Sequence, residues 1–261
     1  MPSLEENRNA WGTEESWPMD GEGWSSPWGS SAAQWRWCLL PRIGTFIPAD
    51  TILEIGPGHG RWTRFIKEQC SSLIVVDLSP NCIDACKRRF ATDTHISYHV
   101  NDGTSLDVVE DGSIDFVFSF DSLVHAEADV IEAYLRQLTQ KLRPDGVGFI
   151  HHSNTGRYRR YFNATDSVYR REFFARAGLL DTNHHFRARS MTAELFEQFA
   201  RAAGLKCIGQ EIVNWNTRRL IDTLSIITLP GSRLDRSNVV VRNPDFMREA
   251  AHAARMEKVY L

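Results

Sequence analysis

The feature that most restricts the fold of this chain is an apolar run that ends in a glycine-rich turn. Residues 52–60 read Ile-Leu-Glu-Ile-Gly-Pro-Gly-His-Gly, and a helical pattern with Trp62, Phe65 and Ile66 follows. Glycines in such a turn allow the backbone to approach a ligand closely. The sequence therefore predicts a binding turn between a buried strand and a helix.

The alternation of strand and helix continues along the chain. Parallel strands separated by helices need crossover connections, which place helices on both faces of the sheet. We therefore predict an α/β fold, a doubly wound, mostly parallel seven-stranded sheet. The last two strands are candidates for antiparallel pairing. The expected strands are 51–55, 73–77, 95–100, 114–120, 146–152, 205–213 and 220–229.

A length of 261 residues suits one large domain with additions. Residues 1–30 hold many of the tryptophans and are predicted to pack on the domain, as structural filler or as a wall of the active site, because disordered tails lack aromatics. Residues 31–230 form the predicted domain, with a basic, aromatic lid insertion at about 153–190. Residues 231–261 form a C-terminal extension whose helix either docks on the body or serves a homo-oligomer contact.

Bulk properties favour a small-molecule partner. The net charge of −3 and the pI near 6.3 give no general attraction to nucleic acid. The five cysteines include no C-x-x-C pair and are expected to be reduced. The acidic start lacks a signal-peptide pattern, and no apolar run approaches the ~20 residues of a membrane span. A cytoplasmic protein without a nucleic-acid or membrane partner is expected.

The glycine spacing separates two cofactor classes. Gly56, Gly58 and Gly60 do not fit the G-x-G-x-x-G dinucleotide fingerprint, because Arg61 stands where its third glycine belongs. This disfavours a nicotinamide-dependent oxidoreductase. The run resembles motif I, E-x-G-x-G-x-G, of class I S-adenosylmethionine-dependent methyltransferases, and the resemblance extends over residues 51–153 and more loosely to 229. It implies a Rossmann-like methyltransferase fold with S-adenosylmethionine as cofactor.

Two acidic residues extend this resemblance. Asp77 ends the second strand, about twenty residues beyond the glycines, where a carboxylate can accept hydrogen bonds from ribose hydroxyls. By the resemblance, Asp102 after the third strand would face the adenine amino group. Each acid has the alternative of capping a helix or making a turn. The predicted cofactor-binding residues are Glu54, Gly56, Gly58, Gly60, Asp77, Leu78, Asp102, Gly103 and Phe120.

The fourth strand runs into the candidate catalytic residues. Its end lacks the N-P-P-Y or D-P-P-Y tetrapeptide, which argues against methylation of a nucleic-acid base. Transfer to a hydroxyl needs a base or a metal, and His125 is the preferred base. Asp121 could bind the methionine amino group, orient a histidine or ligate a metal, but no metal is predicted because ligand spacing is lacking.

Other histidines compete for the role of base. His151 and His152 end the fifth strand, and because successive strand residues point to opposite faces, at most one is expected to face the site. Asn154 and the His184-His185 pair could join it. The predicted catalytic residues are therefore His125, Asp121, His152 and His151.

These observations favour O-methylation of a hydroxylated small molecule, such as a sugar or a saccharide end. The N-terminal tryptophans could supply a stacking platform. Arginines of the insertion either hold an anionic acceptor or form a solvated lid. The alternatives are an N-methyltransferase, a natural-product methyltransferase and a non-catalytic S-adenosylmethionine-binding subunit.

Overall fold

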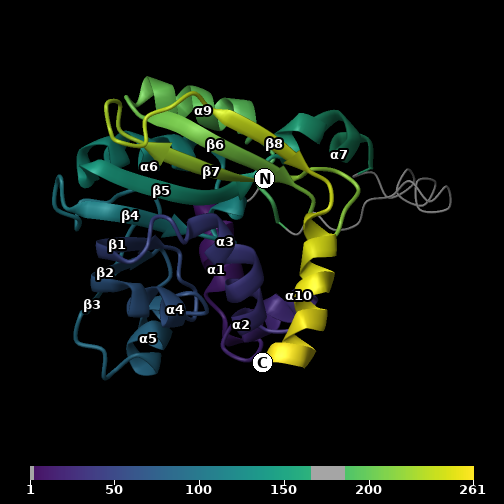
Figure 1. The fold of residues 1–261 in the computed structure, drawn as a ribbon, viewed down its shortest axis with the longest axis horizontal. Helices are drawn as coiled ribbons and strands as arrows, with labels where there is room; N and C mark the ends of the chain where they lie inside the picture. The colour runs from purple at the N-terminus through teal and green to yellow at the C-terminus, as the bar shows by residue number, and fades with distance from the viewer. Residues whose placement is uncertain (1–2, 166–185) are drawn as a thin grey trace.

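The computed structural model describes residues 3–165 and 186–261, and its centre is one sheet (Figure 1). In the described residues the sheet has eight strands in the order β3-β2-β1-β4-β5-β7-β6-β8. The strands are β1 (Ala49–Ile55), β2 (Cys70–Asp77), β3 (Ile96–Val100), β4 (Ile114–Ser119), β5 (Leu142–Ser153), β6 (Lys206–Val213), β7 (Asp222–Thr228) and β8 (Val239–Asn243).

The strand directions confirm the predicted doubly wound fold. Strands β1 to β5 pair in parallel, whereas β7 runs antiparallel to both of its neighbours, β5 and β6. The last two predicted strands were the candidates for antiparallel pairing. The predicted count of seven was wrong by one, because β8 adds in parallel to β6 at the edge. Its residues are mostly exposed and carry three successive valines, so they show no alternation of buried and exposed positions.

Helices cover both faces of the sheet, with α6 and α9 on one side and α2, α3 and α10 on the other (Figure 1). Neighbouring residues of one strand enter different cores: Ile52 packs with the α10 side and Leu53 with the α6 side. The helices are α1 (Leu4–Trp11), α2 (Ser31–Gln34), α3 (Leu40–Ile43), α4 (Thr63–Ile66), α5 (Pro80–Arg89), α6 (Ala128–Lys141), α7 (Arg159–Thr165), α9 (Ala193–Ala202) and α10 (Phe246–Tyr260).

Local signals set where several helices begin and end. The Thr192 hydroxyl accepts a hydrogen bond from the Leu195 amide and so caps the start of α9. Ser79 caps α5 in the same way, with Pro80 in the first turn. Gly204 ends α9 in the left-handed region, at φ 87°.

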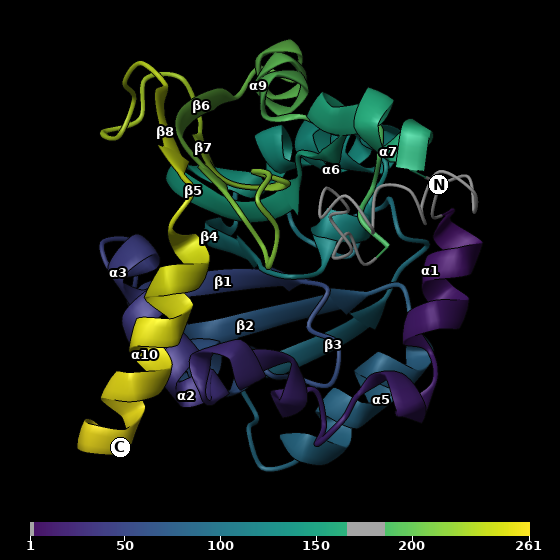
Figure 2. The same cartoon turned by 90° about the vertical axis from the view of Figure 1, so that its right-hand side faces the viewer.

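The segment before the sheet lies across the carboxyl ends of the strands and then along one flank. In Figure 2 the arrows of β1 to β3 point toward α1. Two 3₁₀ turns follow α1, Glu14–Ser16 and Glu22–Trp28. The buried Trp28 ring lies 5.1 Å from Trp215 and 6.0 Å from Phe246 of α10. Thus α10 docks on the body through residues far from it in sequence.

Parts of the predicted lid insertion lie within the described residues. A 3₁₀ turn (Thr155–Tyr158) and α7 open it, and residues 186–190 close it. Several residues that make this insertion basic and aromatic (Arg170, Arg171, Phe173 and Phe174) lie outside the described residues, as does the His184-His185 pair. Within the described ranges, none of the helices has both the length and the apolar character to cross a bilayer.

Candidate functional site

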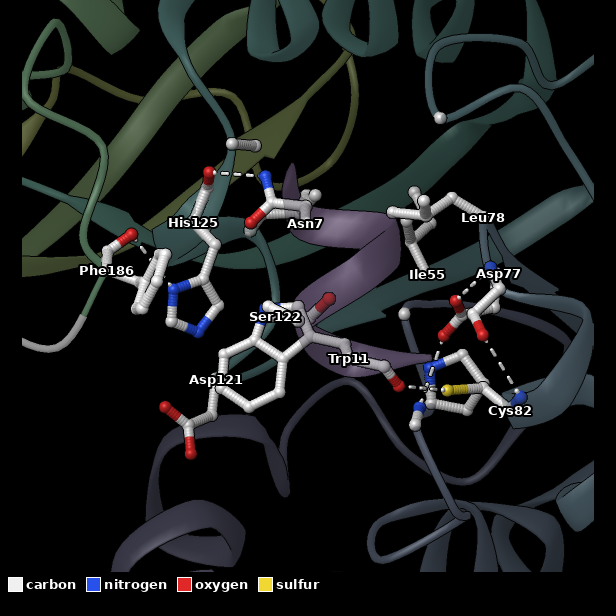
Figure 3. A pocket seen from close by; sticks show the side chains of 18 of the residues that line it. Asn7, Trp11, Ile55, Asp77, Leu78, Cys82, Asp121, Ser122, His125 and Phe186 are labelled. Atoms are coloured by element: carbon white, nitrogen blue, oxygen red, sulfur yellow. Dashed lines mark hydrogen bonds between the residues drawn. The ribbon is translucent and has the colours of Figure 1, made fainter. Parts of the chain in front are cut away.

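A cavity of about 410 Å³ lies at the carboxyl ends of β1, β2 and β4, under the N-terminal segment (Figure 3). Its volume falls within the range of small-molecule sites, and its place is where open α/β sheets bind ligands. The walls come from the N-terminal segment (Leu4, Asn7, Trp11, Trp17, Trp24), the strand ends (Gly56, Gly58, Arg61, Asp77, Leu78, Gly103, Phe120, Asp121, Ser122, His125) and later residues (Phe186, Arg187, Trp215).

The glycine turn is built from backbone that only glycine adopts readily. Gly56, Gly58 and Gly60 have φ of 73°, 57° and 83°. A Cβ at Gly56 would overlap Ser122, and one at Gly58 would lie 2.2 Å from the Trp17 ring. Gly56 and Gly58 line the cavity. Gly60 instead lies against Phe90, so its contribution is to the packing of the turn.

Asp77 stands at the cavity wall as a buried carboxylate. Its Oδ2 accepts a hydrogen bond from the Gly58 amide at 3.3 Å, and its Oδ1 accepts one from the Ser79 amide at 2.8 Å. Burial raises the pKa of Asp77 to about 6 against the lowering effect of these amides. The carboxylate therefore ties the glycine turn to the start of α5, and the neighbouring Leu78 also lines the cavity.

Glu54 lies beneath the turn and outside the cavity lining. It is buried, and its carboxyl accepts a hydrogen bond from the Thr63 hydroxyl at 2.6 Å. Burial raises its pKa to about 8, although the Thr63 hydrogen bond opposes the shift. From this position Glu54 supports the glycine turn and does not contact a ligand in the cavity.

We expect Glu54→Gln to remove a pH dependence of stability. A carboxyl whose folded pKa is near 8 and whose reference value is 4.5 stabilises the fold fully below pH 4.5, and this stabilisation is lost as the pH rises through 8. The free energy of unfolding, measured with urea, should decrease by about 3 kcal/mol more in the wild type than in the variant when the pH is raised from 5 to 8. Glu110→Gln, at an exposed position, is the control. Equal pH slopes for wild type and Glu54→Gln would contradict this.

Asp102, the residue predicted to contact adenine, turns away from the cavity. The Asp102 side chain is exposed, and its Oδ1 accepts hydrogen bonds from the Thr104 and Ser105 amides, both at 2.7 Å. It does not line the cavity, whereas Gly103 does. The alternative of a turn-forming acid therefore describes Asp102 in this structure.

His125 is held at the cavity wall from two sides. Its Nδ1 lies 3.2 Å from the Phe186 carbonyl oxygen, and its ring packs against Trp11 with centroids 4.7 Å apart. Because a carbonyl only accepts, Nδ1 carries the hydrogen and Nε2 keeps its lone pair. Burial, followed by the charge of Arg187, lowers the pKa of His125 to about 4. The ring is thus neutral near pH 7.

Asp121 follows β4 and faces the cavity with an ionised carboxylate. Burial alone would raise its pKa, but the charges of Arg61 and Arg187 outweigh burial and hold the pKa below its usual range. Its Oδ2 accepts a hydrogen bond from Arg61 at 2.8 Å. The Asp121 amide donates to Nδ1 of His151 at 3.1 Å.

His151 and His152 point to opposite faces of β5, as strand alternation requires. His151 lies next to Phe120 and Asp121 on the side of the site, just outside the cavity lining. His152 stacks on Phe196 of α9 with centroids 4.2 Å apart, and its Nε2 lies 2.8 Å from the Ser225 hydroxyl. The prediction of His152 as catalytic is therefore wrong, because its ring belongs to the α6–α9 core.

Asn154 has a structural position. Its Nδ2 donates to the Leu220 carbonyl, and its Oδ1 accepts from the Ala193 amide at the start of α9. No group of three or more His, Cys, Asp or Glu side chains within the described ranges has the geometry of a metal site. The Asp121 carboxylate forms an ion pair with Arg61.

Several cavity residues were absent from the predicted set. Arg61 directly follows the glycine turn, a position that the sequence alone could have singled out. Asn7 donates to the His125 carbonyl at 3.0 Å. Arg187 forms a buried ion pair with Asp222 at 2.7 Å, and no local pattern in the sequence relates these two residues.

Comparison with known proteins places this geometry in context. Residues 52–146 match the family model described as a methyltransferase domain. The chain is 29% identical over 111 residues to a Caenorhabditis elegans protein named phosphoethanolamine N-methyltransferase 2, covering 41% of this chain and 25% of that protein. It is 27% identical over 108 residues to magnesium-protoporphyrin O-methyltransferase of Rhodobacter capsulatus, covering 41% and 47%.

The chain spans less than half the length of these curated relatives. Among solved structures, the N-methyltransferase NodS from Bradyrhizobium japonicum WM9, in complex with S-adenosyl-L-homocysteine, aligns with a TM-score of 0.58. That alignment covers 88% of this chain and 100% of NodS at 14% identity. At this identity the likeness establishes a shared fold.

Proposed function

We propose that residues 52–146, which match the model of a methyltransferase domain, form a class I S-adenosylmethionine-dependent methyltransferase domain, and that the chain methylates a hydroxyl oxygen of a small molecule. The observation that carries the proposal is His125. Its neutral ring is fixed by the Phe186 carbonyl and by Trp11 at the wall of the cavity that holds the glycine turn. A hydroxyl acceptor needs such a base, because its proton must leave as the bond to carbon forms.

The glycine turn and Asp77 fit S-adenosylmethionine as cofactor. Gly56 and Gly58 expose backbone in the left-handed region, and Asp77 supplies a buried acceptor suited to ribose hydroxyls. When bound, the cofactor supplies an electrophilic methyl group on a sulfonium sulfur. Asp77 and the turn position it, and His125 Nε2 takes the hydroxyl proton of the acceptor. Much of the rate then comes from holding the two reactants in line.

We propose a saccharide as the acceptor. Trp11, Trp17 and Trp24 form one aromatic wall, with centroids 5.8 Å apart for Trp11 and Trp17 and 6.0 Å for Trp11 and Trp24. Aromatic faces suit the apolar faces of sugar rings. The cavity arginines, Arg61 and Arg187, each pair with a carboxylate. This compensation favours a neutral hydroxylated acceptor over an anionic one.

Trp24→Ala is expected to raise the KM for the acceptor by about tenfold and to leave S-adenosylhomocysteine binding unchanged, because about 1.4 kcal/mol of ring contact is lost. Steady-state kinetics and calorimetry measure the two quantities. Trp37→Ala, which changes a tryptophan outside the cavity lining, is the control. An unchanged KM in Trp24→Ala would exclude this ring from the acceptor site.

The function itself is tested by calorimetry with S-adenosylmethionine and S-adenosylhomocysteine, followed by an acceptor screen that pairs sugars with amines. Methyl transfer to oxygen, identified by NMR of the product, is the expected result. Transfer to nitrogen would make the chain an N-methyltransferase. Cofactor binding without turnover on any acceptor would favour a non-catalytic subunit. Lack of cofactor binding would overturn the proposal.

A further inference from the structure

The end of β4 contains a residue in an unusual conformation. Asp121 has φ 62°, in the left-handed region that non-glycine residues rarely adopt. The turn that results brings Ser122 directly against Gly56, where a Cβ on the glycine would overlap the serine side chain. The conformation of Asp121 therefore sets how the end of β4 meets the glycine turn.

The buried side chain of His151 accepts a hydrogen bond from the backbone amide of Asp121. The Asp121 N–H donates to His151 Nδ1 at 3.1 Å. The His151 ring has no exposed surface and packs between Phe120 and Trp215, with centroids 4.7 and 5.3 Å away. A strained conformation persists where its surroundings fix it, and this contact fixes the backbone of Asp121.

The surroundings of Nε2, on the other side of the His151 ring, favour the tautomer in which Nδ1 can accept a hydrogen bond. His151 Nε2 lies 3.4 Å from Oδ2 of Asp222, a long contact that still places a carboxylate on that side. Asp222 is itself fixed by three hydrogen bonds from Arg187, at 2.9, 3.1 and 2.7 Å. A hydrogen on Nε2 directed at Asp222 leaves the Nδ1 lone pair for the Asp121 amide.

We propose that His151 is a positioning residue that holds the Asp121 turn against the glycine turn, with Asp222 setting its tautomer. The Nδ1 lone pair is already used by a backbone amide, so His151 does not act as the base. The inference rests on the proposed function only in that the cavity binds S-adenosylhomocysteine.

Two substitutions of His151 distinguish the contribution of Nδ1 from that of Nε2. His151→Asn can place an amide oxygen where Nδ1 lies, whereas His151→Gln places its amide group where Nε2 lies. We expect His151→Asn to bind S-adenosylhomocysteine within about threefold of wild type and His151→Gln to bind about tenfold more weakly, the low end for leaving a buried amide unpaired. Equal weakening of both variants, no weakening of either, or a weaker Asn variant would overturn the inference.

A measurement on the unliganded protein keeps the inference independent of the proposed function. Exchange of the Asp121 amide, followed by NMR, should be slow in wild type and His151→Asn and at least about tenfold faster in His151→Gln. The ¹⁵N spectrum of wild-type histidines should show His151 with its hydrogen on Nε2. A hydrogen on Nδ1, or equally slow exchange in both variants, would overturn the inference even if the wild type binds no cofactor.

Discussion

Replacement of His125 by alanine is expected to lower kcat by about 10²- to 10⁴-fold, the range for removal of a general base. The acceptor hydroxyl would then have no group to take its proton as the bond to the methyl carbon forms. The affinity for S-adenosylhomocysteine should change by less than about threefold, since the glycine turn and Asp77 are intact. Single-turnover kinetics at saturating cofactor measure the first quantity and calorimetry the second.

The pH profile gives an independent check on this base. A general base acts in its deprotonated form, and the pKa of His125 is lowered to about 4 by burial and Arg187. The kcat of the wild type should therefore hold as the pH falls from 7 to about 5 and decline only near pH 4. His252→Ala, at an exposed position of α10, is the control. Full activity in His125→Ala would remove His125 from the mechanism.

Asp77→Asn should weaken S-adenosylhomocysteine binding by about 100-fold. The substitution removes a charged acceptor that also holds the Gly58 and Ser79 amides, and hydrogen bonds to charged groups contribute about 1.5–3 kcal/mol each. Calorimetry at pH 7.5 measures the loss. Asp107→Asn, an exposed acid, is the matched control, and equal affinity in the wild type and Asp77→Asn would show that Asp77 does not contact the ligand.

The same carboxyl should make cofactor binding depend on pH. Burial raises the pKa of Asp77 to about 6, so the acceptor form is lost as the pH falls through that value. Affinity of the wild type for S-adenosylhomocysteine should decrease between pH 7 and 5, and the weaker affinity of Asp77→Asn should stay nearly constant over the same range.

Much of the fold follows from local patterns. The buried parallel strands are apolar runs between helices, and this order alone predicts a doubly wound sheet. Strand β8 was missed because its valines are exposed, and an unprotected edge strand has no periodicity to detect. The division of the chain into 1–30, 31–230 and 231–261 stays a prediction.

The site is less accessible to sequence reasoning, because spacing fixes where a strand ends but not where its side chains point. Asp102 follows the third strand as predicted, yet its carboxylate turns back to its own loop. Alternation along β5 indicates that only one of His151 and His152 faces the site, but the choice depends on pairing with β4 and β7. The partner of His151, Asp222, lies 71 positions along the chain and has no local signature.

The contact of Trp28 with Phe246 has a consequence for synthesis on the ribosome. The aromatic wall of the cavity belongs to a segment that also rests on α10, so its packing is complete only after more than two hundred further residues have been made. Contacts of such sequence separation form late and slow folding. Until α10 has been made, the Trp28 ring lacks its contact with Phe246, so the docking of α10 completes the packing of the N-terminal segment.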